Sequence, residues 1–329
     1  MQSTQQDMNV IEMMKPGGPE ALVRNERPIP DPGPSQVLVK VVAAGVNGPD
    51  IMQRKGLYPA PKGASDLLGL EVSGEVAAIG ENVDMWKVGD VLCGLTNGGG
   101  YAEYCAVEQS HCLQIPDGIG IADAAGLPET YFTVWSNIFM TAGLQSGETL
   151  LVHGGAGGIG TTAIQLGKAF GARVFATDSP AERIKICTDL GADRAIDYNE
   201  EDFVEIVRQA GGANVVLDIV GGPYVARNVK ACAPGGRIVQ LAFALGSKVE
   251  IDLMPVMLKR LQYGGSTLRS RSDAQKTEIA RQLRETVWPL FGVGKLKPVT
   301  GTTLPLAAAA DAHNMMESAG HTGKILLTM

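Results

Sequence analysis

The rhythm of hydrophobic and polar residues changes at about residue 121 of this chain. Before that point, short segments that alternate or run apolar, at 36–42, 72–79, 88–92 and 101–107, are separated by turns rich in glycine and proline. Many short strands with such punctuation are typical of a compact, partly barrel-like β domain. We therefore predict a β-rich N-terminal domain over residues 1–125.

After residue 121 the pattern becomes an alternation of helices and apolar strands. Residues 122–142 have a helical pattern that Pro128 interrupts. The following elements are expected to be strands at 149–153, 173–177, 194–197, 214–220 and 236–241, and helices at 159–170, 180–190, 200–210 and 224–232. Such alternation predicts an α/β domain with a parallel, doubly wound sheet, here assigned to residues 126–294. Residues 295–329, with a helix at 305–318 and a strand at 323–328, are expected to rejoin the first domain.

Composition and charge narrow the functional class. The chain has 329 residues, of which 45 % are hydrophobic and 19 % charged, as in globular proteins. Its net charge of −7 argues against nucleic acid as a partner. No apolar run approaches the roughly 20 residues of a membrane helix, and the N-terminus lacks the pattern of a signal peptide. We therefore expect a cytoplasmic protein.

The cysteines and histidines give little support for catalysis or metal binding. Five cysteines are scattered through the sequence without a C-x-x-C pair, so we expect idle, buried thiols rather than disulfides or a zinc site. The four histidines form no recognisable relay, and we expect each to be a hydrogen-bonded or surface side chain.

The most informative motif is the run HGGAGGIG at 153–160. Its glycines at 155, 157 and 160 form G-x-G-x-x-G between an apolar strand and a helical pattern. In that context one glycine makes the tight turn, one admits a pyrophosphate, and one lets the helix pack on the strand. The phosphates would lie on the N–H groups of the helix N-terminus. The expected cofactor-binding residues of this loop are Gly155, Ala156, Gly157, Gly158, Ile159 and Gly160.

A second strand follows the glycine loop and ends on Asp178. This acidic residue lies about 20 residues beyond the glycines, where dinucleotide folds place the side chain that contacts the adenosine ribose. The two signals together predict a nicotinamide-dinucleotide site.

Several motifs resemble the medium-chain dehydrogenase/reductase superfamily, and in particular its zinc-free quinone oxidoreductase branch. They are GVNGPD at 45–50, LGLEVSG at 68–74, KVGDV at 87–91, the glycine run, and GKI at 323–325. The segments MQRKGLY at 52–58 and LRSR at 268–271 resemble the subgroup that contains the tumour-suppressor-induced mammalian quinone oxidoreductase, with zeta-crystallin more distant. The resemblance implies a GroES-like N-terminal domain followed by a Rossmann domain.

The same resemblance also indicates whether the protein binds zinc. The zinc-dependent members have a cysteine where this chain has Asn47 and a histidine where it has Leu70. Leucine has no lone pair to donate, and asparagine is a poor zinc ligand. The four-cysteine zinc lobe is replaced by the short turn 96–100. We therefore expect no metal, and a substrate with its own electron sink, such as a quinone or an enone.

By resemblance, Tyr58, Asn47 and Thr133 lie near the nicotinamide or the substrate. Tyr58 has a ring that stacks on flat substrates and a phenol O–H that donates a hydrogen bond. Each residue also has a structural alternative. Tyr58 would stabilise its proline-flanked loop, Asn47 would bond nearby backbone, and Thr133 would bond its own helix.

The identity of the dinucleotide depends on the end of the second strand. Asp178 favours the free 2′-hydroxyl of NADH, whereas Arg183 and Tyr198 are residue types that hold a 2′-phosphate. The subgroup favours NADPH and has Gly-Ser where this chain has Ser179 and Pro180. Ser179 is expected to bind the cofactor at the ribose end together with Asp178, Arg183 and Tyr198. We expect NADPH, with NADH as the alternative because of Asp178. By resemblance, Phe243 lies beneath the nicotinamide and Arg269 lines the cofactor cleft.

These inferences predict an NAD(P)H-dependent quinone oxidoreductase that acts without zinc on a small-molecule substrate. An alkenal or enone double-bond reductase is the alternative within enzymes. A protein that binds the dinucleotide only as a structural or sensing ligand is the alternative of another class. The family commonly pairs edge strands, so a homodimer is expected, with the segment 249–253 at the pairing edge.

Overall fold

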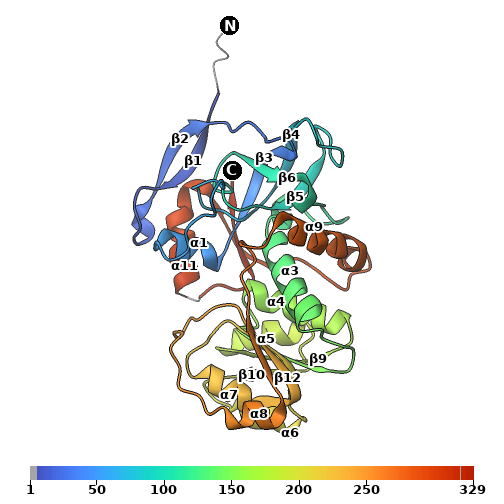
Figure 1. The fold of residues 1–329 in the computed structure, drawn as a ribbon. Coiled ribbons are helices and arrows are strands. Elements are labelled where there is room, and N and C mark those ends of the chain that lie inside the picture. Colours follow the sequence, from blue (N-terminus) through green and yellow to red (C-terminus); the bar gives the residue numbers. More distant parts are fainter. Residues whose placement is uncertain (1–5, 319) are drawn as a thin grey trace. The chain divides into compact units, whose positions relative to one another are not determined.

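The computed structural model describes residues 6–318 and 320–329 and divides into two compact units (Figure 1). Unit 1 combines the chain up to Phe132 with Arg269–Met329, and unit 2 is Thr133–Leu268. Both boundaries differ from the expected 125/126 and 294/295. The first lies later because Tyr131 packs in unit 1 against Trp288 and Phe291. The chain returns to unit 1 earlier because residues 273–282 form a helix that packs on the turn at 109–111.

Unit 1 is built on a mainly antiparallel sheet, as its short, punctuated segments predicted. The sheet has the strand order β14-β15-β3-β4-β5-β7, with β6 also paired to β3, and β1 and β2 form a separate antiparallel pair. The strands are β1 (Asp7–Met13), β2 (Leu22–Pro28), β3 (Gln36–Val46), β4 (Glu71–Ile79), β5 (Val91–Leu95), β6 (Tyr104–Glu108), β7 (Cys112–Gln114), β14 (Thr300–Pro305) and β15 (Lys324–Thr328).

Strand β3 is longer than its pattern predicted because its second half has a distant partner. Residues 43–46 pair antiparallel with β15, in a register that sets Ile325 opposite Val46. The C-terminal strand therefore completes the sheet of unit 1, which confirms that the chain end rejoins the first domain. The pairing joins residues almost 280 positions apart, so no local pattern could indicate it.

The described residues of unit 1 also form several helices. They are α1 (Gly48–Arg54), α2 (Ile121–Ala124), α3 (Pro128–Val134, whose last two residues belong to unit 2), α9 (Asp273–Gln282), α10 (Pro289–Gly292) and α11 (Ala309–Glu317). Helix α9 was not predicted, because few of its residues are apolar. It begins with a capping box in which Ser272 and Gln275 bond each other's backbone N–H groups, and this S-x-x-Q signal was present in the sequence.

Unit 2 is the predicted doubly wound domain. Its strands are all parallel and have the order β10-β9-β8-β11-β12-β13, the arrangement of two mononucleotide-binding halves. The elements are β8 (Thr149–His153), α4 (Gly158–Ala169), β9 (Arg173–Asp178), α5 (Ala181–Asp189), β10 (Arg194–Asp197), α6 (Phe203–Gln209), β11 (Ala213–Asp218), α7 (Tyr224–Ala231), β12 (Cys232–Gln240), α8 (Met254–Lys259) and β13 (Gln262–Gly265).

The apolar runs of the central strands are buried, as a covered parallel sheet requires. Every residue of β8 is buried, and Val215, Val216 and Leu217 of β11 have no exposed surface. The strand order reverses between β8 and β11. In open sheets of this kind, ligands bind outside the carboxyl ends of the strands at that reversal. The glycine run follows β8 directly and therefore lies at this position.

The last strand of unit 2 was not predicted. The segment 249–253, expected at the pairing edge, is not a strand, and β13 forms the edge of the sheet instead. Every residue of β13 is exposed, and the preceding helix α8 exposes Met254, Met257 and Leu258. No helix in the described ranges is both long and apolar enough to span a membrane.

Candidate active site

The glycine run forms the turn between β8 and α4 in unit 2. Its left-handed residue is Gly154, with φ of 74°, so the tight turn is made one position before the G-x-G-x-x-G triplet and not by a triplet glycine. Gly155 and Gly160 are required for packing. A Cβ on Gly160 would lie 2.2 Å from the Gly154 carbonyl oxygen, and one on Gly155 would lie 2.6 Å from Cys187 Sγ.

Gly157 differs from the other two glycines of the motif. A Cβ there would meet only the Gly154 carbonyl oxygen, at 3.5 Å, so no neighbour in the protein requires a glycine. Gly157 precedes the first turn of α4, whose opening N–H groups have no acceptor within the helix. Open space in front of unpaired N–H groups at a helix N-terminus suits an anionic group. The loop therefore fits the pyrophosphate of a dinucleotide.

Asp178 stabilises the glycine loop from the end of β9. Its carboxylate accepts hydrogen bonds from the backbone N–H of Ala156 at 2.7 Å and of Ser179 at 2.9 Å. The Arg183 guanidinium donates to both carboxylate oxygens, with Nε at 2.6 Å and Nη2 at 3.2 Å. Asp178 is almost fully buried. Its charge is thus balanced by Arg183 and two backbone amides before any ligand is present.

The four residues predicted at the ribose end lie together at the ends of β9 and β10. Asp197 pairs with Asp178 in the sheet, and the next residue, Tyr198, donates its backbone N–H to the Asp178 carbonyl at 3.3 Å. The Tyr198 side chain is exposed. Ser179 Oγ accepts a hydrogen bond from Asn199 at 2.8 Å, and Arg183 lies in the first turn of α5. The grouping has one acidic and one basic side chain, already paired with each other.

A buried hydrogen-bond chain crosses the strand ends beneath this loop. His153 contacts Thr177 Oγ1 through Nδ1 at 2.8 Å and Asn228 Oδ1 through Nε2 at 2.7 Å, and Asn228 donates to Asp218 at 2.8 Å. Because Asn228 Oδ1 only accepts, Nε2 of His153 carries the proton. Burial lowers the pKa of His153, so the ring stays neutral. His153 is thus a fully bonded core histidine, as expected.

In unit 1, Asn47 belongs to a buried polar cluster. Its side chain donates to Glu71 Oε1 at 2.9 Å and accepts from Lys324 Nζ at 2.6 Å. Lys324 also forms an ion pair with Glu71 at 2.6 Å. The Asn47 backbone N–H donates to Asp50 at 2.9 Å, and burial raises the pKa of Asp50 to about 6. Both ends of the Asn47 amide are therefore occupied within the protein.

Tyr58 and Arg269 lie near this cluster. Arg269 donates to Gln53 Oε1 at 2.6 Å and to the Asn97 carbonyl at 3.0 Å, and its guanidinium lies 5.7 Å from the centre of the Tyr58 ring. Burial, with the nearby charge of Glu129, raises the pKa of Tyr58, so its phenol stays protonated. Arg269 and Tyr58 are therefore neighbouring side chains within unit 1.

Thr133 and Phe243 are in unit 2. The carbonyl of Thr133 accepts hydrogen bonds from Asn137 Nδ2 at 2.8 Å and Ser136 Oγ at 3.3 Å, and no hydrogen bond from its hydroxyl to a described residue is found. The turn that begins at Phe243 pairs with the loop after β11, where Leu245 N–H donates to the Val220 carbonyl at 2.8 Å. Phe243 is 46 % exposed, so its ring is available to a ligand.

Asn47 and Leu70, which occupy the positions of zinc ligands in zinc-dependent members, do not fit a zinc site. Leu70 is buried and offers no donor atom, and Asn47 Oδ1 already accepts from Lys324. Within the described residues, no group of three or more histidine, cysteine or acidic side chains is arranged to hold a metal. All five cysteines are free and buried, as expected.

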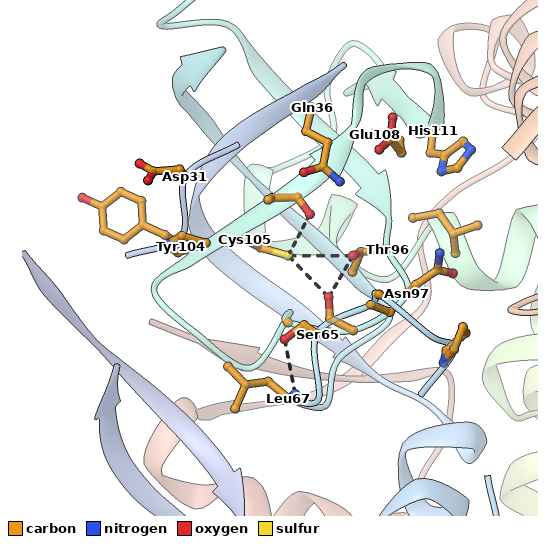
Figure 2. Close-up of a pocket in the computed structure, with 18 of the residues that line it drawn as sticks. Asp31, Gln36, Ser65, Leu67, Thr96, Asn97, Tyr104, Cys105, Glu108 and His111 are labelled. Carbon is orange, nitrogen blue, oxygen red and sulfur yellow. Dashed lines mark hydrogen bonds between the residues drawn. The ribbon is translucent and has the colours of Figure 1, made fainter. Parts of the chain in front are cut away.

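A pocket of about 530 Å³ lies elsewhere in unit 1, between the turn 96–99 and the segment 61–65. Figure 2 shows Cys105 beside Thr96 in this pocket, with Gln36, Glu108 and His111 on the neighbouring wall. The Cys105 thiol contacts the Gly98 carbonyl at 3.8 Å, and burial raises its pKa to about 12. None of Asn47, Tyr58 and Arg269 lines this pocket. The pocket therefore has a different lining but adjoins Arg269, because the carbonyl of its lining residue Asn97 accepts a hydrogen bond from Arg269.

Two glutamates and a lysine complete the cluster, although no functional role was predicted for them. The pairing of Glu71 with Lys324 of the GKI motif was not predicted. Glu129 donates its backbone N–H to Glu71 Oε2 at 2.8 Å and is buried. No sequence signal marks Glu129 beyond its place after Pro128 at the start of a helix.

Comparisons with known proteins agree with the fold. Residues 33–117 match the alcohol dehydrogenase GroES-like domain, and residues 158–283 match the zinc-binding dehydrogenase family. The quinone oxidoreductase of Sus scrofa is 31 % identical, with all of both chains covered. The chain therefore belongs to the medium-chain dehydrogenase/reductase superfamily. Within it, the chain is one of the quinone oxidoreductase-like members.

Three solved structures are similar over 98 % of this chain. The quinone oxidoreductase of Pseudomonas syringae is 30 % identical with a TM-score of 0.87, and all of its chain is covered. A mycobacterial protein solved with NADPH is 29 % identical with a TM-score of 0.87, again with its whole chain covered. The CurK enoyl reductase is 28 % identical with a TM-score of 0.85, and 99 % of its chain is covered.

The open space at Gly157 generates a test of the dinucleotide site. Gly157→Val should leave the fold intact and weaken binding of NADPH at least tenfold, because the new side chain enters the space proposed for the pyrophosphate. Calorimetric titration measures the affinity, and thermal unfolding checks the fold. Gly160→Val is the contrast, since its side chain would overlap backbone and should destabilise the protein. Unchanged affinity in a folded Gly157→Val protein would remove the site assignment.

Proposed function

We propose that this protein is an NAD(P)H-dependent quinone oxidoreductase that works without zinc. The observation that carries the proposal is the polar cluster of unit 1. At the positions where zinc-dependent relatives have ligands, this chain has a buried leucine and an asparagine whose amide is fully bonded to Glu71 and Lys324. A substrate with no metal to polarise it must accept charge on its own oxygen, and quinones do so.

The chain's own residues supply binding and orientation. The glycine loop and the N-terminus of α4 would hold the pyrophosphate, and the nicotinamide, when bound, supplies the hydride. Tyr58 would stack on the flat ring of the substrate and donate its phenol O–H to the substrate oxygen. Asn47 and Thr133 are proposed to contact the substrate or nicotinamide. Phe243 is proposed as a wall beneath the nicotinamide, and Arg269 acts by holding Tyr58.

A double-bond reductase is the second candidate. The similarity to the CurK enoyl reductase favours it, because an enone also delocalises the arriving charge onto an oxygen. A protein that binds the dinucleotide without catalysing a reaction is the third candidate.

A substrate panel distinguishes these candidates. Purified protein with NADPH should turn over ortho- or para-quinones, and the rate should survive exhaustive dialysis against EDTA. NADPH oxidation is followed by its absorbance, with enones and alkenals in parallel. Turnover confined to the enones would replace the quinone assignment with a double-bond reductase. If NADPH binds but is not oxidised in the presence of any of these acceptors, the protein is better described as one that only binds the dinucleotide. Loss of the rate on chelation, restored by zinc alone, would overturn the zinc-free proposal.

For the cofactor we propose NADPH over NADH. The similarity to a protein solved with NADPH supports this choice. Arg183 is the cation that would contact a 2′-phosphate, while Asp178 would repel it. Because Asp178 is balanced by Arg183 and two amides, its repulsion is weaker than that of an unpaired carboxylate.

Two substitutions test the assignment of the ribose end. Asp178→Asn keeps an acceptor for the Ala156 N–H but removes the charge, so the NADPH/NADH ratio of kcat/KM should rise. Arg183→Ala removes a charge-assisted contact of about 1.5–3 kcal/mol, so the ratio should fall about ten- to a hundred-fold. Lys185→Ala, an exposed lysine of the same helix, is the control and should leave the ratio unchanged. Changes below about threefold in both test variants would show that the ribose end has been misplaced.

We also propose that the protein is a homodimer that pairs through the β13 edge. This edge strand is exposed, and beside it α8 exposes Met257 and Leu258 by 64 % and 66 %. An open strand edge next to large apolar side chains favours association with another copy.

Light scattering at micromolar concentration should give the mass of a dimer. Leu258→Glu should shift the protein towards monomer, because the carboxylate would be buried in the interface. Val293→Glu, which replaces an equally exposed residue of unit 1, should leave the mass unchanged. The proposal would be contradicted if the wild-type protein were a monomer. It would also be contradicted if the Leu258→Glu protein formed a dimer with the same dissociation constant as wild type.

A further inference from the structure

Glu129 has a buried carboxyl group for which the proposed reaction has so far no use. It lies in the first turn of α3, is only 8 % exposed, and is anchored through its backbone N–H, which donates to Glu71 Oε2 at 2.8 Å. Among residues 6–318 and 320–329, no hydrogen bond or ion pair to its own carboxyl oxygens is found. A buried carboxylate without a partner is costly, whereas a neutral carboxylic acid is not.

The charges around Glu129 also oppose its ionisation. Glu71 and Asp50 are acidic neighbours, and the nearest cations are engaged elsewhere. Lys324 pairs with Glu71 at 2.6 Å, and Lys276 donates to Asn97 Oδ1 at 2.6 Å. Burial and the negative charge of Glu71 raise the pKa of Glu129 to about 8. The charged and titratable groups that face it are Asp50 of α1, Tyr58 of the following loop, Glu71 of β4, Arg269, Lys276 of α9 and Lys324 of β15.

Glu129 also adjoins a residue proposed to contact substrate, because the Glu71 carboxylate that accepts its backbone N–H also accepts a hydrogen bond from the Asn47 amide. When ionised, Glu129 acts to raise the pKa of both Tyr58 and Arg269, and the Arg269 guanidinium lies 5.7 Å from the centre of the Tyr58 ring. Tyr58 and Glu129 each carry an O–H group at neutral pH, but the two differ in how readily they release the proton. The phenol of Tyr58 has a pKa above its usual value of 10, so it donates a hydrogen bond and keeps its proton. The acid of Glu129 is matched to proton transfer near neutral pH.

We propose that Glu129 is the proton donor that completes reduction of the substrate, an inference that rests on the reductase function proposed above. Hydride transfer brings two electrons to the quinone or enone and leaves a negative charge on its oxygen. The O–H bond of Glu129 breaks, a new O–H bond forms on that oxygen, and Glu129 becomes a carboxylate. Water returns a proton to Glu129 before the next turnover, so the sum is one hydride and one proton for each substrate.

The protonated state of Glu129 can be measured without turnover. The infrared difference spectrum between wild type and Glu129→Gln at pH 7 should show the carbonyl band of a protonated carboxylic acid. This band should disappear as the pH rises through about 8, because ionisation removes it. A carboxylate band at pH 7 would overturn the proposal.

Kinetics then test the donor role. Glu129→Gln keeps the size of the side chain but has no acidic proton, so kcat should fall about 10²- to 10⁴-fold at pH 7, with unchanged affinity for NADPH. In wild type, kcat should be highest below pH 8 and fall above it, because the active form is the protonated one. This fall should be absent from Glu129→Gln. Glu129→Asp, which keeps an acid on a shorter arm, should recover part of kcat and retain a fall at alkaline pH.

A matched carboxyl group serves as the control. Glu108 also has a pKa raised by burial, but it lies on β6 opposite Gln36 and is not part of the cluster of Asn47, Glu71 and Lys324, so Glu108→Gln should keep the wild-type rate and pH profile. Full activity of Glu129→Gln with an unchanged pH profile would show that another group donates the proton. A wild type that binds NADPH but reduces no quinone or enone, with the infrared band present, would instead remove the reductase function, and the donor role with it.

Discussion

The buried ion pair between Lys324 and Glu71 is the interaction on which unit 1 depends. It joins the first residue of the last strand to the first residue of β4, and Asn47 bonds both members. Removing one partner of such a pair leaves a charge in the core and costs about 3–5 kcal/mol. Because the positive charge of Lys324 is paired with Glu71, it does not form an ion pair with the carboxyl group of Glu129. One contact therefore closes the sheet and sets the protonation of the candidate site.

The two units have different kinds of polar groups, which suit different ligands. Unit 2 presents glycine backbone, a helix N-terminus and a balanced Asp178–Arg183 pair, all of which suit a phosphate-bearing ligand. Unit 1 presents neutral or internally paired groups: Tyr58 with its phenol protonated, Asn47 with its amide bonded, and Glu129 as an acid. Such groups suit an uncharged, planar substrate better than an anionic one, because the positive charge of Lys324 is already paired with Glu71.

The sequence predicted the fold well where structure is local and poorly where it is not. The parallel strands of unit 2 were predicted because each is an apolar run followed by a helical pattern, and the glycine motif marked the edge that binds a ligand. The extension of β3 to Val46 was missed because its partner is the C-terminal strand. The role of Gly154 was missed because a left-handed φ is a property of the backbone that the motif does not encode. Glu129 was missed because its chemistry comes from Glu71, Asp50 and Lys324, which lie on three other elements.

The burial of the cysteines has a chemical consequence for a protein that is proposed to reduce quinones. Quinones and enones are electrophiles that alkylate thiolates, so an enzyme that binds them risks modification by its own substrate. Every thiol in this chain is buried, and burial raises the pKa of Cys187 and of Cys232 to about 12 and also raises the pKa of Cys93 and of Cys112. Almost no thiolate is therefore present at neutral pH, and none is presented to solvent. The burial that makes these cysteines catalytically idle also protects their thiols from the compounds that the protein is proposed to reduce.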